Sequence, residues 1–460
     1  MSMALPESVR NELKKFFDRT KKSSEIFEKS KLLVPFGVSS NYRAMDPYPL
    51  YFKAARGSKL IDADGNEYID YNLCFGVAVA GHAHPRLVEV ITERIKNGTV
   101  LGFEYERTYE LAEVIKKRFF VDMVRFSSTG LEATLHAIRV ARAYTQRDKI
   151  IKFLGCYHGS HDFFLVATKP NIYAAGHVKR PAKVPSGPGV SKGALSEIFI
   201  AQFGDLESVE NILREHPDEV AAVILEPVAM NIGLIVPSKE FMKGLRRLCD
   251  EYGVVLIFDE VKTSGKLYHG AEEYFEVKPD LKTMAKAIGG GFPISVIAGK
   301  KEIMENYGPE KVPHAGTFNS NPLVIDAAIV TLTEILTKEN MEKSIKLNME
   351  LVKGYKDILT DAKVPIQVPY FGNSATPFFS EREIKNWHDF LRYQHVGRWW
   401  AYFIAMLNRG VVATAPGYDE QWTVSVQHTE EDIQKTLDAL NDIARMLAEP
   451  IPPIKIVEAF

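Results

Sequence analysis

Two residues of opposite charge, Asp259 and Lys286, stand where chemistry could occur. Asp259 ends the apolar run 254–258, and Lys286 lies in an apolar stretch just before the glycines 289–291. An apolar run rich in Val and Ile is typical of a strand buried on both faces. A carboxylate that follows such a strand lies at the carboxyl edge of the sheet, where open α/β folds bind ligands. Pyridoxal phosphate needs both groups, an amine for a Schiff base and a carboxylate that keeps its ring nitrogen protonated.

Lys262 is the alternative lysine, because it follows Asp259 by only three residues. The carboxylates of Asp259 and Glu260 would keep its amine charged. The apolar neighbours of Lys286 instead favour the neutral form of that amine by desolvation. Since the neutral amine is the nucleophile, we predict that Lys286 is the reactive lysine.

Three further sites have the residue types that surround a phosphorylated, planar cofactor. Ser128, Thr129 and Gly130 follow a predicted strand and begin a predicted helix, so their amides and hydroxyls could hold a phosphate or simply cap the helix. Tyr157 follows another predicted strand, and its ring could stack on a cofactor or pack on its own sheet. Thr317 lies in a predicted loop and indicates no function by itself.

His82 and His84 have the spacing of a metal-binding pair. No further ligand is suitably spaced, so we interpret them as structural histidines and predict no metal site. The cysteines at 74, 156 and 249 form no C-x-x-C pair and no disulfide framework, which is typical of an intracellular protein.

The composition is that of an ordinary globular protein. The chain has 460 residues, of which 46% are hydrophobic and 25% charged, with a net charge of -2. This charge gives no reason to expect binding to nucleic acid or to an anionic membrane. The first thirty residues lack the apolar core of a signal peptide, and no apolar run approaches the ~20 residues of a membrane helix. We therefore expect a cytoplasmic protein.

The elements that position these residues alternate between strands and helices. Predicted strands lie at 121–126, 149–154, 221–225 and 254–258, and a predicted helix spans 132–144. This alternation predicts an α/β fold with a mostly parallel sheet that helices flank on both sides.

Other segments surround this α/β region. Residues 1–30 predict an amphipathic helix or arm, and the alternation over 59–71 around Asp64 and Gly65 predicts a hairpin. The stretch 168–195 has many Pro, Gly and Lys residues, which is typical of a lid or a disordered loop. A final helix begins after Thr429, whose spacing to the acidic residue at 432 predicts a capping box.

Taken together, the motifs resemble those of the class III (subgroup II) pyridoxal-phosphate-dependent aminotransferases. The resemblance extends from about residue 35 to residue 429. The motifs that carry it are 81–85 (GHAHP), 128–130 with 132 and 133 (STG, EA), 157–159 (YHG), 226–227 (EP), 259–261 (DEV), Lys286 with its glycines, 316–317 (GT) and 321–322 (NP).

The resemblance implies fold type I. A large domain at 76–325 would contain a mostly parallel, seven-stranded sheet and the cofactor. An N-terminal arm and part of a small α+β domain would occupy 1–75, and the rest of the small domain would occupy 326–460.

The resemblance also implies roles for the matched positions. Lys286 would form the Schiff base and Asp259 would pair with the ring nitrogen. Tyr157 would stack on the ring, and Glu226 would lie in the pocket.

The remaining cofactor contacts would be to its phosphate. Ser128, Thr129 and Gly130 match the phosphate-binding cup. Thr317 matches a threonine that reaches the phosphate of the neighbouring subunit's cofactor. The resemblance therefore implies a homodimer with shared active sites.

Within the family, the chain is most similar to the glutamate-1-semialdehyde aminomutases and related amino-acid aminotransferases. Ser40, Arg43, Asn231 and Glu420 match substrate-binding positions of the aminomutases, and Arg43 would bind a substrate carboxylate.

Two motifs depart from the aminomutase pattern. Residues 40–42 read Ser-Asn-Tyr where the aminomutases have Ser-Pro-Val, and residues 262–265 read Lys-Thr-Ser-Gly in place of Met-Thr-Gly-Phe. We therefore predict an aminotransferase that moves an amino group from an amino-acid donor, including ω- or β-amino acids, to a 2-oxo acid. An aminomutase is the alternative, and an amino-acid racemase or a cofactor-free relative also stays open.

Overall fold

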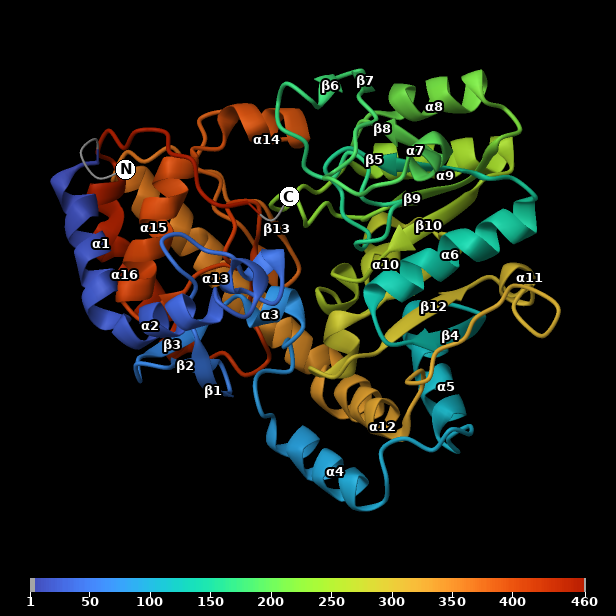
Figure 1. Cartoon of the computed structure of the whole chain (residues 1–460), viewed down its shortest axis with the longest axis horizontal. Helices are drawn as coiled ribbons and strands as arrows, with labels where there is room; N and C mark the ends of the chain where they lie inside the picture. Colours follow the sequence, from blue (N-terminus) through green and yellow to red (C-terminus); the bar gives the residue numbers. More distant parts are fainter. Residues whose placement is uncertain (1–4, 459–460) are drawn as a thin grey trace. The chain divides into compact units, whose positions relative to one another are not determined.

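The computed structural model describes residues 5–458, and these form two compact units (Figure 1). The large unit comprises Pro85–Met341 and Lys385–Arg392. The small unit comprises the chain up to His84, Glu342–Ile384 and the chain from Tyr393 onward. The domain boundaries that we predict from the sequence follow residues 75 and 325.

A seven-stranded sheet forms the centre of the large unit, in the order β4-β12-β11-β10-β9-β5-β8. The strands are β4 Met123–Ser127, β5 Lys149–Phe153, β8 Ile198–Ala201, β9 Val220–Leu225, β10 Val255–Asp259, β11 Leu281–Met284 and β12 Ser295–Gly299. Only β12 is antiparallel to its neighbours, so the predicted mostly parallel sheet is confirmed.

Three of these strands, β8, β11 and β12, were not predicted from the sequence. β11 has only four residues and carries Lys282, which interrupts any apolar signal. The side chain of Lys282 is nevertheless buried, because its ammonium contacts the Glu272 carboxylate at 2.6 Å and donates to the Phe119 carbonyl at 2.7 Å. This strand is therefore stabilised by contacts that are distant in sequence.

Helices cover the sheet of the large unit. The principal helices are α4 Pro85–Lys96, α5 Thr108–Phe119, α6 Gly130–Thr145, α8 Leu206–Glu215, α9 Lys239–Tyr252 and α12 Pro322–Val330. Figure 1 shows α6 lying across the sheet, where it contacts β4 and β9–β12. Residues of α5, α12, β4, β11 and β12 form a buried apolar cluster in this unit.

The small unit contains a four-stranded sheet, β1-β2-β3-β15, and a three-stranded sheet, β13-β14-β16. The strands are β1 Phe52–Arg56, β2 Lys59–Asp62, β3 Glu67–Asp70, β13 Tyr370–Phe371, β14 Ser374–Ala375, β15 Val411–Val412 and β16 Trp422–Thr423. The antiparallel pairing of β2 with β3 confirms the predicted hairpin.

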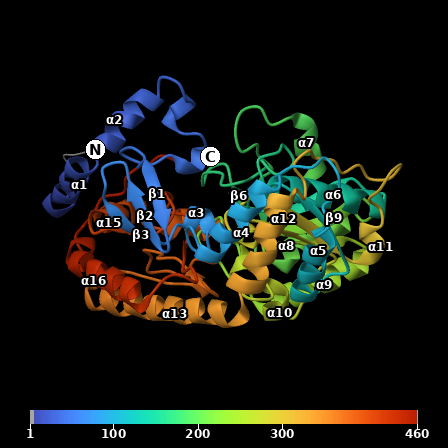
Figure 2. The ribbon, with the colours of Figure 1, turned by 90° about the horizontal axis from the view of Figure 1, so that it is seen from below.

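Helices α1 Glu7–Arg19, α2 Lys21–Ser30, α13 Lys338–Asp361, α15 Val396–Asn408 and α16 Glu430–Leu447 complete this unit. Thr429 and Asp432 form the predicted capping box at the start of α16. Figure 2 shows α13 beside α16, and at their contact a Cβ on Gly354 would lie 2.4 Å from Leu437. Among the helices of residues 5–458, none combines the length and apolar character needed to cross a bilayer.

The stretch 168–195, predicted as a lid or a disordered loop, contains a short hairpin of β6 Gly176–His177 and β7 Arg180–Pro181. Two residues of α14, Trp387–Tyr393, hold it in place. The Trp387 indole donates to the Pro170 carbonyl at 2.7 Å, and the His388 ring nitrogen lies 3.0 Å from the Gly176 carbonyl. A segment more than 200 residues further along the chain therefore orders this loop.

Candidate active site

Asp259 and Lys286 emerge at the same edge of the large sheet. Asp259 is the last residue of β10, and Lys286 begins a 3-10 turn (η5, Lys286–Gly289) that closely follows β11. β10 and β11 are parallel neighbours, and Asp259 pairs in register with Thr283, three residues before Lys286. The sheet therefore brings together the two residues that the sequence singled out.

The backbone of Lys286 has a left-handed conformation, with φ of +53°. Such a conformation costs a non-glycine residue about 1–3 kcal/mol and is found mainly at functional sites. Buried Ile288 anchors the turn in the apolar cluster. Gly290 follows with φ of +59°, and a Cβ there would lie 2.3 Å from the Thr331 hydroxyl oxygen. Close packing therefore requires glycine at position 290, within the predicted glycine run.

The carboxylate of Asp259 is buried and accepts three hydrogen bonds. Oδ1 accepts from the Val261 amide and from the Thr283 hydroxyl, both at 3.1 Å. Oδ2 accepts from Nδ1 of His158 at 2.7 Å. A carboxylate has about four acceptor positions. Within residues 5–458 one position, on Oδ2, therefore stays open for a further donor.

His158 was not among the predicted site residues, although it lies in the Tyr157–Gly159 motif. Its side chain is fully buried, and Nδ1 donates to Asp259. Its Nε2 is also buried and has no hydrogen-bond partner in the described part of the chain. Among the described residues, the bond to Asp259 is therefore the one hydrogen bond of this ring, which also packs edge to face against Phe164.

Glu226, just after β9, connects several predicted residues. Its buried carboxylate accepts from the Tyr157 amide at 3.0 Å through Oε1. Oε2 accepts from the Met230 amide at 3.0 Å and from Nδ2 of Asn231 at 2.8 Å. Three predicted residues, Tyr157, Glu226 and Asn231, therefore form one hydrogen-bonded group. Burial raises the pKa of Tyr157, so its phenol stays neutral.

Lys152, in β5, fixes the loop that carries Tyr157 and His158. Its fully buried ammonium donates to the carbonyls of Phe164 and Val166 at 3.2 and 2.7 Å, and to the Thr168 hydroxyl at 3.0 Å. Burial lowers the pKa of Lys152 to about 8. Sequence reasoning missed this residue, because a lysine within an apolar strand has no motif of its own.

The N-terminus of α6 has the capping arrangement that was the alternative to a phosphate site. Thr129 is the N-cap, and its hydroxyl accepts from the Glu132 amide. The Glu132 carboxylate accepts in return from the Ser128 and Thr129 amides at 3.0 and 2.7 Å. Among the described residues, the amides of Gly130 and Leu131 have no acceptor, as expected in a first helical turn. These two amides can bind an anion.

Lys262, the rival lysine, is buried. Its ammonium donates to the Met230 carbonyl at 3.0 Å. The amine is thus engaged with the segment after β9, next to the Glu226 group.

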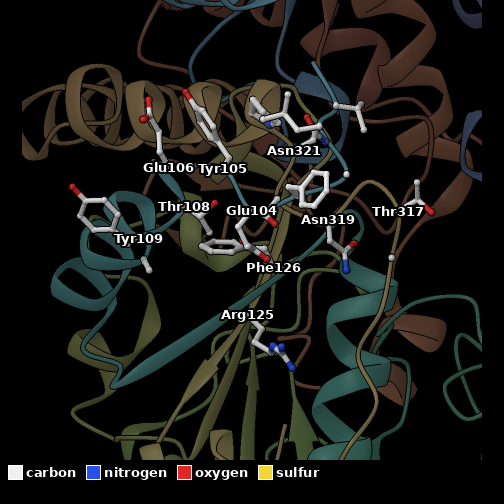
Figure 3. Close-up of a pocket in the computed structure, with 18 of the residues that line it drawn as sticks. Glu104, Tyr105, Glu106, Thr108, Tyr109, Arg125, Phe126, Thr317, Asn319 and Asn321 are labelled. Carbon is white, nitrogen blue, oxygen red and sulfur yellow. The ribbon is translucent and has the colours of Figure 1, made fainter. Parts of the chain in front are cut away.

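Thr317 is exposed on the loop between α11 (Lys301–Met304) and α12. This loop is joined to the end of β4, because Nε2 of His314 lies 2.9 Å from the Ser127 hydroxyl. Figure 3 shows Thr317 and Asn319 on this loop, beside a hollow of about 1080 Å³. Apolar side chains in and near the hollow are strongly exposed, among them Phe103 at 90% and Tyr109 at 70%.

The other predicted substrate residues, Ser40, Arg43 and Glu420, belong to the small unit. Ser40 and Arg43 lie in one turn, in which the Arg43 amide donates to the Ser40 carbonyl at 2.9 Å. Glu420 is buried, and its backbone carbonyl accepts from the Thr376 hydroxyl at 2.9 Å.

The predicted structural histidines also belong to the small unit. Nε2 of His82 lies 2.7 Å from the Asp70 carboxylate, and burial lowers the pKa of His84. No group of three or more His, Cys, Asp or Glu side chains within residues 5–458 is arranged to hold a metal ion.

Known proteins match this chain over the region that contains these motifs. The family Aminotransferase class-III matches residues 41–444. A glutamate-1-semialdehyde 2,1-aminomutase of Thermodesulfovibrio yellowstonii is 38% identical over 436 residues, which cover 93% of this chain and all of that protein. An omega-transaminase of Sphaerobacter thermophilus has a TM-score of 0.87 and 31% identity, over 93% of this chain and 97% of that one. A transaminase with PLP bound has a TM-score of 0.84 and 30% identity, over 93% and 98%.

Proposed function

Because this chain belongs to the class-III aminotransferase family, we propose that Lys286 and Asp259 are its central catalytic residues. The protein is a pyridoxal-phosphate-dependent aminotransferase of fold type I. The observation that carries the proposal is the open acceptor position on buried Asp259, on the strand beside the one that leads into Lys286.

The groups around Asp259 fit a flat, protonated ring. Bound pyridoxal phosphate supplies an electron sink for the carbon that bears the amino group. The open position on Asp259 would accept the ring N–H, and the ring of Tyr157 would stack against the cofactor. Glu226 would fix Tyr157 through its amide, and His158 would fix the Asp259 carboxylate.

Lys286 supplies the base of the reaction. Its Nζ would hold the cofactor covalently. Its amine would act as the general base that removes a proton from the substrate carbon bearing the amino group, and as the general acid that returns it. The Asp259 carboxylate would stabilise positive charge on the ring nitrogen.

The start of α6 would hold the cofactor phosphate. The amides of Gly130 and Leu131 point from a helix N-terminus and have no acceptor among the described residues. The Ser128 hydroxyl would add a donor, and Thr129, as N-cap, would fix the direction of these amides.

A second copy of the chain would complete the site. The hollow beside Thr317 has exposed Phe103 and Tyr109, and apolar side chains of this size are seldom left uncovered together. We infer a homodimer in which Thr317 reaches the cofactor phosphate bound by the partner subunit. The exposure of Thr317 supports this role.

The substrates are proposed to be an amino-acid donor and a 2-oxo acid acceptor. Arg43 and Ser40 would bind the substrate carboxylate, and Asn231 and Glu420 would line the pocket. The departures at 40–42 and 262–265 favour transfer between two substrates over the intramolecular transfer of an aminomutase. Because a similar protein is named an aminomutase, aminomutase activity is one outcome of the substrate screen described below.

Borohydride trapping tests the proposal directly. The purified protein is expected to absorb visible light, to lose this absorption on borohydride treatment, and to retain the cofactor on the peptide that contains Lys286. Lys262→Ala is the matched control and should be labelled normally, whereas Lys286→Ala should lose both label and activity. Label on Lys262 would overturn the assignment.

A substrate screen then separates the two activities. Amino donors are offered with pyruvate or 2-oxoglutarate, and glutamate-1-semialdehyde is offered alone. Release of an oxo product from the donor supports the aminotransferase. Conversion of the semialdehyde without any acceptor would show an aminomutase.

A further inference from the structure

The small unit contains a cavity of about 530 Å³, a volume in the range of small-molecule sites. The segment 37–52, strands β2, β3 and β15, and helix α15 form its walls. Most of its lining is apolar, and includes Val38, Leu50, Leu60, Phe403, Leu407 and Val412. The sequence predicted a substrate-binding role for Arg43 and a structural role for His82, but no role for the apolar part of this lining.

One positive charge, that of Arg43, lines this apolar cavity. The guanidinium is exposed, and Nη1 donates to the Ser39 hydroxyl at 2.9 Å. Within residues 5–458, Arg43 forms no ion pair with an acidic side chain. An unpaired guanidinium is the preferred partner of a carboxylate, which it binds through two parallel hydrogen bonds.

The only carboxylate of the lining, within the described residues, is already engaged in hydrogen bonds. Asp70 is buried and accepts from His82 at 2.7 Å through Oδ2. Its Oδ1 accepts from the amides of Asn72 and Leu73 at 3.0 and 3.1 Å. Among the described residues, Arg43 is therefore the one lysine or arginine side chain on a mostly apolar lining.

A strained turn forms part of the same wall. Leu73, Cys74 and Phe75 all have left-handed backbone, with φ of +47°, +52° and +58°. Asn72 stabilises the turn by accepting from the Phe75 amide at 2.8 Å. The turn brings the Phe75 ring to Tyr42, with 5.7 Å between ring centroids. Strain of this kind persists mainly at sites of ligand binding.

We propose that this cavity binds the apolar body of a monocarboxylate held by Arg43. The inference rests on the proposed function and names its substrate class, amino acids and oxo acids with a large aromatic or long aliphatic side chain. A short substrate would leave the apolar walls in contact with water. A dicarboxylic substrate would bring a second negative charge that has no partner in the cavity.

Amine-free carboxylates test this inference on the purified holoenzyme. Calorimetry would measure the Kd of straight-chain acids from acetate to octanoate, with glutarate as a dicarboxylate probe. We expect the Kd to fall about fourfold for each added methylene, as burial of a CH₂ group by about 0.8 kcal/mol implies. Hexanoate should bind more tightly than glutarate.

Substitutions at two positions distinguish binding of the apolar body from binding of the carboxylate. Val38 has extended backbone that accepts a larger residue, with φ of -130°. Val38→Trp should fill the cavity and remove the dependence of Kd on chain length, whereas Val38→Ala should keep it. Arg43→Ala should weaken every acid at least tenfold, and Arg43→Lys should restore part of that loss.

The outcome is independent of the cofactor test. A Kd that does not change with chain length, or that Arg43→Ala leaves unchanged, would overturn the inference even if borohydride traps the cofactor on Lys286. Loss of trapping with an intact chain-length dependence would instead contradict the proposed function alone.

Discussion

His158 and Asp259, which are 101 residues apart in the sequence, form a buried hydrogen bond of 2.7 Å. His158 comes from the loop after β5 and Asp259 from the end of β10, so the bond joins two strand ends across β9. It fixes Oδ2 of Asp259, the oxygen with the open acceptor position. The orientation of the Asp259 carboxylate therefore depends on a residue of the loop that also carries Tyr157.

Removal of this bond should impair catalysis. His158→Ala takes away a hydrogen bond to a buried, charged group, which is worth about 1.5–3 kcal/mol. We expect kcat to fall about ten- to hundredfold and cofactor binding to weaken. His161→Ala is a suitable control, because His161 has no hydrogen bond to Asp259. Steady-state kinetics and cofactor titration would measure both effects, and a fully active His158→Ala variant would contradict the role.

Lys152 should make stability depend on pH in the alkaline range. Burial lowers the pKa of Lys152 in the folded state to about 8, below its ordinary value of about 10.5. Between these values the unfolded chain binds more protons than the folded one, so the free energy of unfolding rises as the pH rises from 8 to 10.5. Urea unfolding of the wild type and Lys152→Met should differ in this slope, and equal slopes would count against it.

Lys152 should also hold in place the loop after β5, which carries Tyr157 and His158. Lys152→Met removes the ammonium that donates to three acceptors of the loop, whereas Lys152→Arg retains a donor. We expect the methionine variant to release cofactor at least several times faster, with partial rescue by arginine. Release rates followed by visible absorption would measure the difference. Identical rates in wild type and both variants would show that the loop needs no such anchor.

The proposed dimer can be separated from the proposed contact of Thr317. Phe103→Glu places a charge on an exposed apolar side chain, so it should shift the protein toward a monomer in light-scattering measurements. Thr317→Ala should leave the dimer intact and weaken cofactor binding, about tenfold for one lost hydrogen bond to a charged phosphate. A monomeric wild type, or a Thr317→Ala variant with normal cofactor affinity, would contradict the shared site.

Acid should loosen the loop that carries Thr317. Burial lowers the pKa values of His136 and His314 to about 4, and their rings lie 4.4 Å apart. Nδ1 of His136 accepts from Arg139 at 3.0 Å, a bond that the protonated ring cannot make. Ser127, Arg125, Tyr307 and Glu132 also surround the pair.

The unfolded chain therefore binds more protons than the folded one between pH 4 and about 6.5. The free energy of unfolding should fall as the pH falls through this window. His136→Gln should reduce the slope of stability against pH, measured by urea unfolding at several pH values. A slope equal to that of the wild type would show that this pair does not determine acid stability.

Local patterns determined much of this protein from the sequence. The hairpin around Gly65, the capping box at Thr429 and the strand that ends at Asp259 all depend on neighbours within a few residues. The prediction that Lys286 is the reactive lysine likewise rests on its apolar neighbours and on the glycines that follow it. Periodicity and turn chemistry act over such short distances, so a sequence reveals them directly.

The tertiary structure decided how these pieces meet. Buried Lys282 interrupts the apolar pattern of strand β11, and Lys152 anchors a loop through three acceptors that no sequence motif predicts. The bond between His158 and Asp259, and that between Trp387 and Pro170, join residues 101 and 217 positions apart. Such contacts form because the sheet brings distant strand ends to one edge, where buried polar groups must find partners.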